Sequence, residues 1–392
     1  MQSSKTDIEI YMLAGEVFST LTSDIQRTHY NNLKGSITLC WSEEKKFNAW
    51  AISETTLGGA PIHKIVITYE MARQIYRDVE AFYEFARDIR FLNLLKKMPN
   101  GTMPHPLIPK IFNKDDCINN MFFAAITWVY FHELGHLTQE HGFVREERNT
   151  SVAESLIQEL ESSTEKPLSG QASKISHATE LAADCEATVM CLVELARHFT
   201  DEKLVGKNDD RQALIGCYYL IICSLACIFY RFNGGRVSLA NSTPIGTHPD
   251  AIFRLECAAT QFYEFFDMTK KVLGVTISRV DIISLTKQAA DMGAMFWHFV
   301  HTDASTSITD IVIRGLLERR EYKEYAKEII TTWDEISPKI LKLRHFGASF
   351  GILQFGERYR QYVFETSEIM KLVKFQKLQT SRTHSNVLQQ SE

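Results

Sequence analysis

The sequence lacks the patterns that mark several special classes of protein. Its 43 basic and 48 acidic residues give a formal net charge of −5, and no basic block stands out. Proteins that bind nucleic acid usually present such a block to the phosphate backbone. Internal repeats and low-complexity tracts are also missing. With 45% hydrophobic and 23% charged residues, we expect an ordinary globular chain with no nucleic-acid partner.

The eight cysteines include no C-x-x-C pair, the spacing typical of metal-binding or redox pairs. Most of them lie in apolar runs of helical character, where a thiol behaves as a small buried hydrophobe. A secretory signal is disfavoured, because Asp7 and Glu9 interrupt the stretch that would need an apolar core. Both observations predict reduced thiols and a cytoplasmic location.

The periodicity of apolar residues predicts an α+β chain that is predominantly helical, with a small N-terminal β-sheet. Short β-favouring runs at 36–41 and 47–52 predict a hairpin, and 63–69 predicts a third strand. The nearly uncharged stretch 118–140 predicts a central buried helix on which this sheet packs. Further helices are expected at 8–30, 70–98, 153–161 (short, within a polar loop at 146–176) and 177–199.

The C-terminal half is expected to be helical throughout. We predict a domain of residues 1–265, a helical region of residues 266–378 and a disordered tail of residues 379–392. One stretch, 213–230, is 18 residues without a charge, which is the lower length limit for a membrane span. Its Tyr, Cys and Ser content and its flanks of mixed charge favour a buried helix, so a membrane partner is disfavoured but stays open.

The segment FHELGHLTQEH contains His132, Glu133 and His136, an H-E-x-x-H pattern within the expected central helix. Residues at i and i+4 lie on one face of a helix, so both imidazoles can bind a single Zn²⁺. Glu133 would then stand beside the metal as a general base. The apolar residues that precede the motif would hold such a site rigidly in the core.

Zinc in a catalytic site needs a third protein ligand and an open position for water. The metzincin extension fails, because Gln139 and Gly142 stand where that pattern needs Gly and His. Glu180, in the segment ELAADCEA, can supply the third ligand from a second helix. Asp184, one turn further on, can hydrogen-bond the distal nitrogen of a ligating histidine. Glu186 is the alternative carboxylate on the same segment.

The H-E-x-x-H pattern followed by E-x-x-x-D resembles the gluzincin class of zinc metallopeptidases. By that resemblance, His132, His136 and Glu180 ligate zinc and Glu133 activates the water. Asp184 then supports one of the ligating histidines.

Two further segments carry a resemblance to the CAAX-protease and HtpX-type group. THPDAIFR, with His248 and Arg254, is similar to a segment that lies by the active site in that group, so either residue could stabilise the oxyanion. Local alternatives stay open, namely a helix start at His248 and a structural ion pair at Arg254. FNAWAI and IVIT resemble the strand that precedes the zinc helix, where an edge could pair with extended substrate.

Taken together, these segments make the chain look most like the Lit-type phage-exclusion peptidases. The resemblance implies a cytoplasmic zinc endopeptidase that cuts an intracellular protein, with a phage or regulatory trigger and a role in phage exclusion. Two alternatives remain: a catalytically silent zinc-binding regulatory or sensor protein, and a membrane metallopeptidase that uses 213–230 as a span. Four other histidines, His141, His177, His298 and His301, lack ligand spacing to the motif and are expected to be structural or at the surface.

Overall fold

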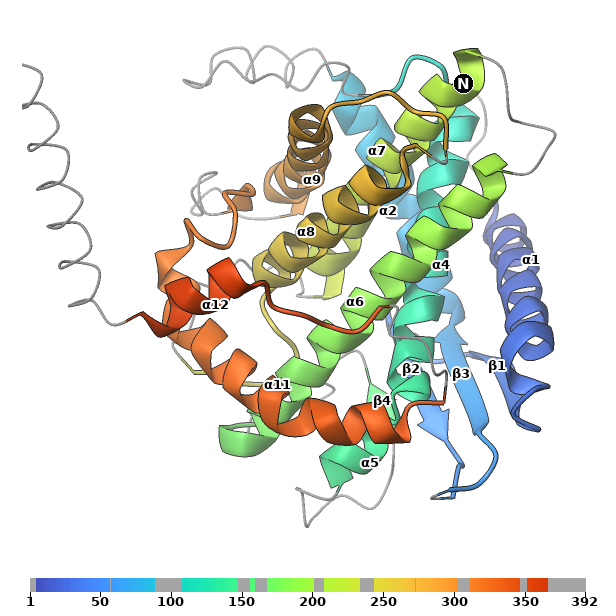
Figure 1. Cartoon of the computed structure of the whole chain (residues 1–392). Coiled ribbons are helices and arrows are strands. Elements are labelled where there is room, and N and C mark those ends of the chain that lie inside the picture. The colour runs from blue at the N-terminus through green and yellow to red at the C-terminus, as the bar shows by residue number, and fades with distance from the viewer. Residues whose placement is uncertain are drawn as a thin grey trace, which may run out of the picture.

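A small sheet, flanked by helices, lies toward one side of a helical body in the computed structural model (Figure 1). The described residues are 5–56, 58–88, 108–146, 156–158, 168–200, 208–232, 243–271, 273–301, 311–345 and 351–365. The elements of the first half are α1 (Asp7–Ile25), the π-helical turn η1 (Gln26–Tyr30), β1 (Ser36–Ser42), β2 (Ala49–Ser53), β3 (Ile62–Thr68), α2 (Tyr69–Arg87), α4 (Lys114–Thr138), α5 (His141–Glu146) and β4 (Leu156–Gln158). Those of the second half are α6 (Gly170–Thr200), α7 (Asn208–Phe232), α8 (Ala251–Thr269), α9 (Arg279–His301), the 3₁₀ turn η2 (Arg320–Tyr322), α11 (Lys323–Leu343) and α12 (Glu357–Phe364). The expectation of an α+β, predominantly helical chain is confirmed.

The sheet has the strand order β1-β3-β2-β4. β3 pairs in parallel with β1 and antiparallel with β2, so the expected hairpin between 36–41 and 47–52 is wrong. The reason is the composition of β3, whose last four residues are all buried. A strand that is apolar on both faces buries most apolar surface at the centre of a sheet. β3 therefore lies between β1 and β2, which are neighbours in sequence.

The short helix expected at 153–161 is also wrong where the structure describes that range. Residues Leu156–Gln158 form β4, which pairs antiparallel with β2 from Ile52 to Trp50. This pairing covers the edge of β2, whose backbone groups would otherwise lack partners within the sheet. An extended substrate therefore finds β2 inside the described sheet rather than at its edge.

The helix that carries H-E-x-x-H is the centre of the molecule, as predicted. α4 begins at a capping box, in which Asn113 accepts from the Asp116 backbone and Asp116 accepts from the Asn113 backbone. Such a cap stabilises a helix start by about 1 kcal/mol. Every residue from Trp128 to Thr138 is buried, and α4 contacts β2, β3, α1, α2, α6 and α7. The sheet and the surrounding helices thus fix the position of this segment from all sides.

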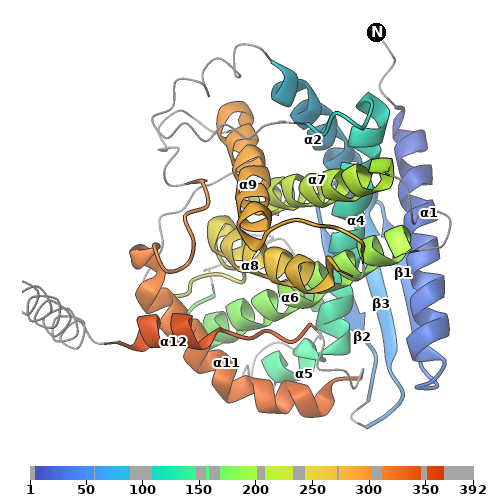
Figure 2. The same ribbon diagram turned by 45° about the horizontal axis from the view of Figure 1, so that its top comes forward.

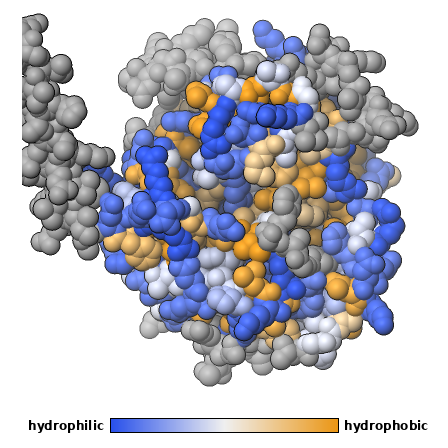
Figure 3. All heavy atoms as spheres, viewed as in Figure 1, coloured by the Kyte–Doolittle hydropathy of each residue, from blue (hydrophilic) through white to orange (hydrophobic). Residues whose placement is uncertain are grey.

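The long apolar stretch at 213–230 lies within α7, which packs against α4, α8 and α9 (Figure 2). Gln212–Phe232 is the one described helix with the length and hydropathy of a membrane span. In the structure, 78% of its apolar 18-residue stretch is buried. This is the packing of a core helix, the interpretation that the sequence favoured. On the outer face seen in Figure 3, hydrophobic residues are interspersed among hydrophilic ones.

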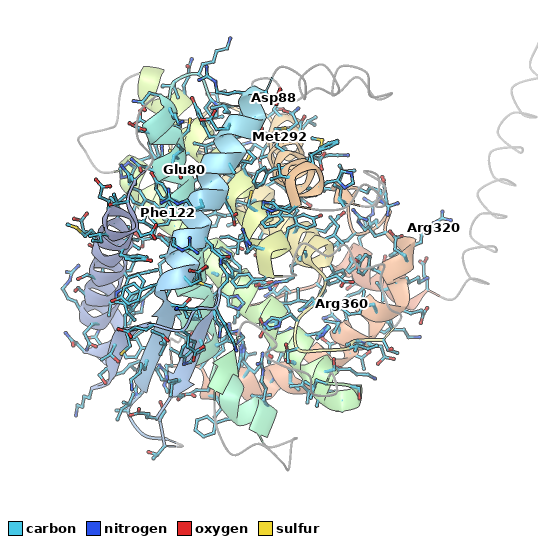
Figure 4. All side chains as sticks on the ribbon, turned by 180° about the vertical axis from the view of Figure 1, so that it is seen from behind. Glu80, Asp88, Phe122, Met292, Arg320 and Arg360 are labelled. Atoms are coloured by element: carbon cyan, nitrogen blue, oxygen red, sulfur yellow. The ribbon has the colours of Figure 1, made fainter. Side chains whose placement is uncertain are left out.

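The second half of the chain is helical where described, as expected. One hydrophobic cluster joins the sheet with α1, α2, α4, α7 and α9, and another joins α6 and α8 with α11 and α12. Seen from behind, Glu80 on α2, Asp88 directly after α2 and Phe122 on α4 lie in the upper part of the view, and Arg320 and Arg360 lie lower and to the right (Figure 4). The division at residues 265 and 266 stays a prediction, and the tail 379–392 lies outside the described residues.

Candidate metal centre

The two helices that carry the expected ligands meet at Gly135, the fourth residue of the H-E-L-G-H motif. A Cβ at Gly135 would lie 3.2 Å from the Ala183 Cα and 3.3 Å from its carbonyl oxygen. Only a residue without a side chain allows this approach without a shift of the backbone. The close crossing of α4 and α6 brings the segment around Glu180 and Asp184 against the imidazoles of α4 (Figure 2).

His132, His136 and Glu180 come together at this crossing. The Nε2 atoms of His132 and His136 are 3.0 Å apart, and they lie 3.3 and 3.4 Å from the two carboxylate oxygens of Glu180. All three side chains are buried, and their ligand atoms lie within 4.8 Å of one another. The three residues singled out in the sequence therefore converge on one point.

The other nitrogen of His132 faces a buried ion pair. Its Nδ1 lies 2.9 Å from Asp184 Oδ1. Arg254 donates from Nε and Nη2 to the two carboxylate oxygens of Asp184, at 2.8 and 2.6 Å. The Arg254 guanidinium also lies 4.8 Å from the Phe229 ring centre. Asp184 thus stands where the sequence placed it, whereas Arg254 reaches His132 through Asp184.

His136 is supported by a residue whose position in the sequence indicates no role at the site. His141 is fully buried at the start of α5, and its Nδ1 lies 2.8 Å from the Nδ1 of His136. His141 stands one residue before the position at which the metzincin pattern requires a histidine. Burial lowers the pKa of His136 to about 4, against the opposing effect of Glu180. Its imidazole is therefore neutral at neutral pH, the form that binds a metal.

Arg145 is a second residue that the sequence did not reveal. It lies on α5, and its Nη2 donates to Glu180 Oε1 at 2.7 Å and to Thr179 Oγ1 at 2.7 Å. Burial alone would raise the pKa of Glu180, but the neighbouring histidines, His248 first, outweigh burial and hold it well below its usual range. Glu180 is therefore a carboxylate at neutral pH. A charge-assisted hydrogen bond orients it, which suits a metal ligand.

His248 also faces this cluster, from the segment that precedes α8. Its Nε2 lies 3.4 Å from Glu180 Oε2, and its Nδ1 lies 2.7 Å from Thr247 Oγ1. The His248 side chain is 16% exposed, whereas those of His132, His136 and Glu180 are at most 1% exposed. His248 is therefore more exposed than the two histidines of the motif.

Glu133 and Glu186 occupy different surroundings. Glu133 is fully buried on α4, between the two histidines of the motif in sequence. Glu186 accepts hydrogen bonds from Thr138 Oγ1, Gln139 Nε2 and Arg344 Nη2. Those contacts tie the end of α4 to α6 and α11, so Glu180, rather than Glu186, is the carboxylate that joins the two imidazoles.

The donor set fits a transition metal such as zinc. Two imidazole nitrogens and a carboxylate oxygen are ligands that Zn²⁺ takes in catalytic sites. A hydrogen-bonding group lies behind each of them, namely Asp184, His141 and Arg145. Such partners fix the orientation of ligands and strengthen metal binding.

This fold and this ligand set define a metallopeptidase-like protein. The chain belongs to the Peptidase U49 family, whose family model matches residues 47–274. That range contains the strands β2 and β3, α4, α6 and the segment with His248. No curated protein and no solved structure matches the chain. Family membership supports a peptidase function with a protein substrate.

Proposed function

We propose that this chain is a zinc-dependent endopeptidase in which His132, His136 and Glu180 hold the metal. The observation that carries the proposal is the convergence of these three buried side chains, within 4.8 Å, in a chain of a peptidase family. The likeness to gluzincins supports the same ligand assignment. The likeness to the CAAX-protease and HtpX-type group supports the placement of His248 near the reacting carbonyl.

Peptide hydrolysis needs an activated water and a polarised carbonyl. Zinc held by His132, His136 and Glu180 would supply both, because zinc lowers the pKa of a bound water toward 7 and acts as a Lewis acid. Glu133 accepts a proton from the attacking water and delivers it to the leaving amine. Its burial next to the two histidines in the motif favours this role, since a general base works best where solvent does not compete for the proton.

His248 is our candidate for the donor to the oxyanion, and Arg254 is a positioning residue. Thr247 Oγ1 lies 2.7 Å from His248 Nδ1, and a hydroxyl that donates there leaves the imidazole proton on Nε2, which faces Glu180. An N–H group aimed at developing negative charge lowers the barrier to attack. Arg254 is engaged with both oxygens of Asp184, so it acts by holding the partner of His132.

The substrate is proposed to be an intracellular protein that the enzyme cuts in the cytoplasm. The eight free cysteines fit a reducing compartment. The likeness to Lit-type peptidases supports a role in phage exclusion, with a phage product as the trigger. An unrestrained cytoplasmic peptidase would damage its own cell, so activity is expected only when the trigger is present.

The test compares the wild type with Glu133→Gln and Glu180→Ala. In cells that express each variant and are challenged with phage, newly formed protein N-termini are identified by chemical labelling and mass spectrometry. Wild type should produce termini that are missing with Glu133→Gln. The purified Glu133→Gln protein should keep its zinc by elemental mass spectrometry, whereas Glu180→Ala should lose the metal of this site.

A matched control is Glu186→Gln, which neutralises a buried carboxylate outside the ligand set. It should keep both zinc and cleavage. Full cleavage or full phage exclusion by Glu133→Gln would contradict the peptidase mechanism and leave a zinc-binding regulatory protein.

A further inference from the structure

A second cluster of histidine and carboxylate side chains lies just beyond the end of α4. His63 Nε2 is 3.2 Å from Glu140 Oε1, and His345 Nε2 is 2.6 Å from the same oxygen. The three ligand atoms lie within 4.8 Å of one another. None of these residues belongs to the H-E-x-x-H site. They come from β3, from the turn after α4 and from the turn after α11.

We propose that His63, Glu140 and His345 form a second divalent-cation site of the zinc type. Two imidazoles and one carboxylate repeat the donor set of the first site, and they use none of its residues. Among the described residues, these two sets are the groups of histidine, cysteine and carboxylate side chains that converge in this way.

The groups behind the proposed ligands support this assignment. Tyr30 Oη lies 2.7 Å from His63 Nδ1, which leaves Nε2 to face Glu140. Ser53 Oγ donates to Glu140 Oε2 at 3.1 Å, which leaves Oε1 toward the two imidazoles. Protein ligands to metals usually have such hydrogen-bonding partners, which fix the ring and the carboxylate in the binding orientation.

The backbone at Glu140 gives an independent reason to assign a role to its side chain. Glu140 adopts φ +47°, in the left-handed region, just after the last turn of α4. Glycine is the common residue at this position after a helix, because other residues are strained there. A buried glutamate in this conformation indicates that its carboxylate is needed, since strained residues concentrate at functional sites.

The cluster opens to solvent on one side. His63 and Glu140 are each 2% exposed, whereas the side chain of His345 is 15% exposed. A water could therefore complete the coordination beside His345. The backbone N–H of His345 donates to the carbonyl of Thr138 at 3.1 Å, so α4 and the turn after α11 are already in contact. A cation here would fasten the end of α11 to the sheet and to the helix that carries the first site.

The test measures bound zinc in the full-length protein after zinc loading and dialysis. We expect about two zinc ions per chain in wild type, about one in Glu180→Ala, about one in His345→Ala and none in the double variant. His345 is partly exposed at the end of a helix, so its replacement should leave the fold intact, which circular dichroism checks. His198→Ala, an exposed histidine on α6, is the matched control and should bind as wild type does.

A thermal measurement separates a cation site from a purely hydrogen-bonded network. Added Zn²⁺ should raise the Tm of Glu180→Ala, in which the first site is disabled, and should not raise that of Glu180→Ala/His345→Ala. If folded Glu180→Ala binds no zinc, or if His345→Ala keeps the wild-type content, the second site is refuted. Refutation of the second site would not refute the first site. The first site is measured separately, as the zinc that Glu180→Ala loses relative to wild type.

Discussion

One histidine–carboxylate cluster lies on α4 and the other lies just beyond its end, and the chain assembles them in different ways. His132 and His136 come from one motif on α4, and Glu180 comes from α6, which crosses it at Gly135. His63 and His345 meet Glu140 from segments 77 and 205 residues away. The first cluster has a buried Asp184–Arg254 ion pair behind a histidine, and the second has the hydroxyls of Tyr30 and Ser53.

The same set of metal-binding side chains can therefore be held with different firmness, and it can be easy or hard to detect in a sequence. A helix spacing of four residues is a local pattern, because it places two side chains on one face whatever the rest of the fold does. A set collected from a strand and two turns has no such pattern. Charged support also holds a ligand more firmly than neutral support, since charge-assisted hydrogen bonds are about twice as strong.

The largest effect is expected from removing a ligand of the first cluster. His132→Ala should lose about one zinc per chain and all measurable peptidase activity, because two protein ligands do not retain the metal in a catalytic site. His141→Ala, which removes only the partner of His136, should weaken zinc binding by about 10–100-fold. Metal titration with a competing chelator measures both. Equal loss in the two variants would mean that His141 is itself a ligand.

The buried ion pair behind His132 should matter strongly for stability. Arg254→Ala leaves the Asp184 carboxylate buried without its guanidinium and should reduce the free energy of unfolding by about 3–5 kcal/mol. Arg254→Lys should recover part of this loss, because a lysine restores the charge but not the two-pronged hydrogen bond. Urea unfolding measures the differences. A loss below about 1 kcal/mol in Arg254→Ala would place the pair at an exposed site instead.

Glu186, which is hydrogen-bonded to Thr138 and Gln139 at the end of α4, should make stability depend on pH. Burial raises its pKa to about 7, although Arg344 and hydrogen bonds from Gln139 and Thr138 act in the opposite direction. Between pH 4.5 and 7 the folded protein keeps a proton that the unfolded chain has released, so stability falls as pH rises through this window. The fall is at most about 3 kcal/mol.

Glu186→Gln should remove this contribution. Relative to wild type, the variant should become more stable at pH 8 than at pH 4.5, because glutamine carries no charge at either pH. Urea unfolding of both proteins across this range gives the comparison. Stability curves that run parallel over the whole range would show that Glu186 titrates as it does in the unfolded chain.

The smallest effect is expected from the neutral support of the second cluster. Tyr30→Phe removes the hydroxyl that faces His63 Nδ1 and should cost about 1–2 kcal/mol of stability. Zinc at the second cluster should bind about 10-fold more weakly, and zinc at the first should be unchanged. Zinc titration of Tyr30→Phe in the Glu180→Ala background isolates the second cluster. If Tyr30→Phe lost as much stability as Arg254→Ala, then charged and neutral hydrogen-bonding partners would not differ in their effect.

Much of the fold follows from local patterns in the sequence. The helical periodicity of α1, α2, α4, α6 and α7 could be predicted because each element shows a continuous apolar face or core. The hairpin between 36–41 and 47–52 was wrong because strand pairing is decided by which strand is most apolar on both faces, and this favours β3 at the centre. The strand at Leu156–Gln158 was missed because it exists through its pairing with β2, which no local pattern indicates.

The sequence by itself determined the α+β, largely helical class and the residues His132, Glu133, His136, Glu180 and Asp184 as a candidate set. It could do so because an H-E-x-x-H motif and an E-x-x-x-D motif each place their groups on one helix face. Only the tertiary structure decided that Glu180 rather than Glu186 lies against the histidines and that Arg254 pairs with Asp184. The tertiary structure also places His141 and Arg145 against the first cluster and assembles the second cluster. Contacts between residues far apart in the chain depend on how helices and strands pack, and no short-range spacing encodes that packing.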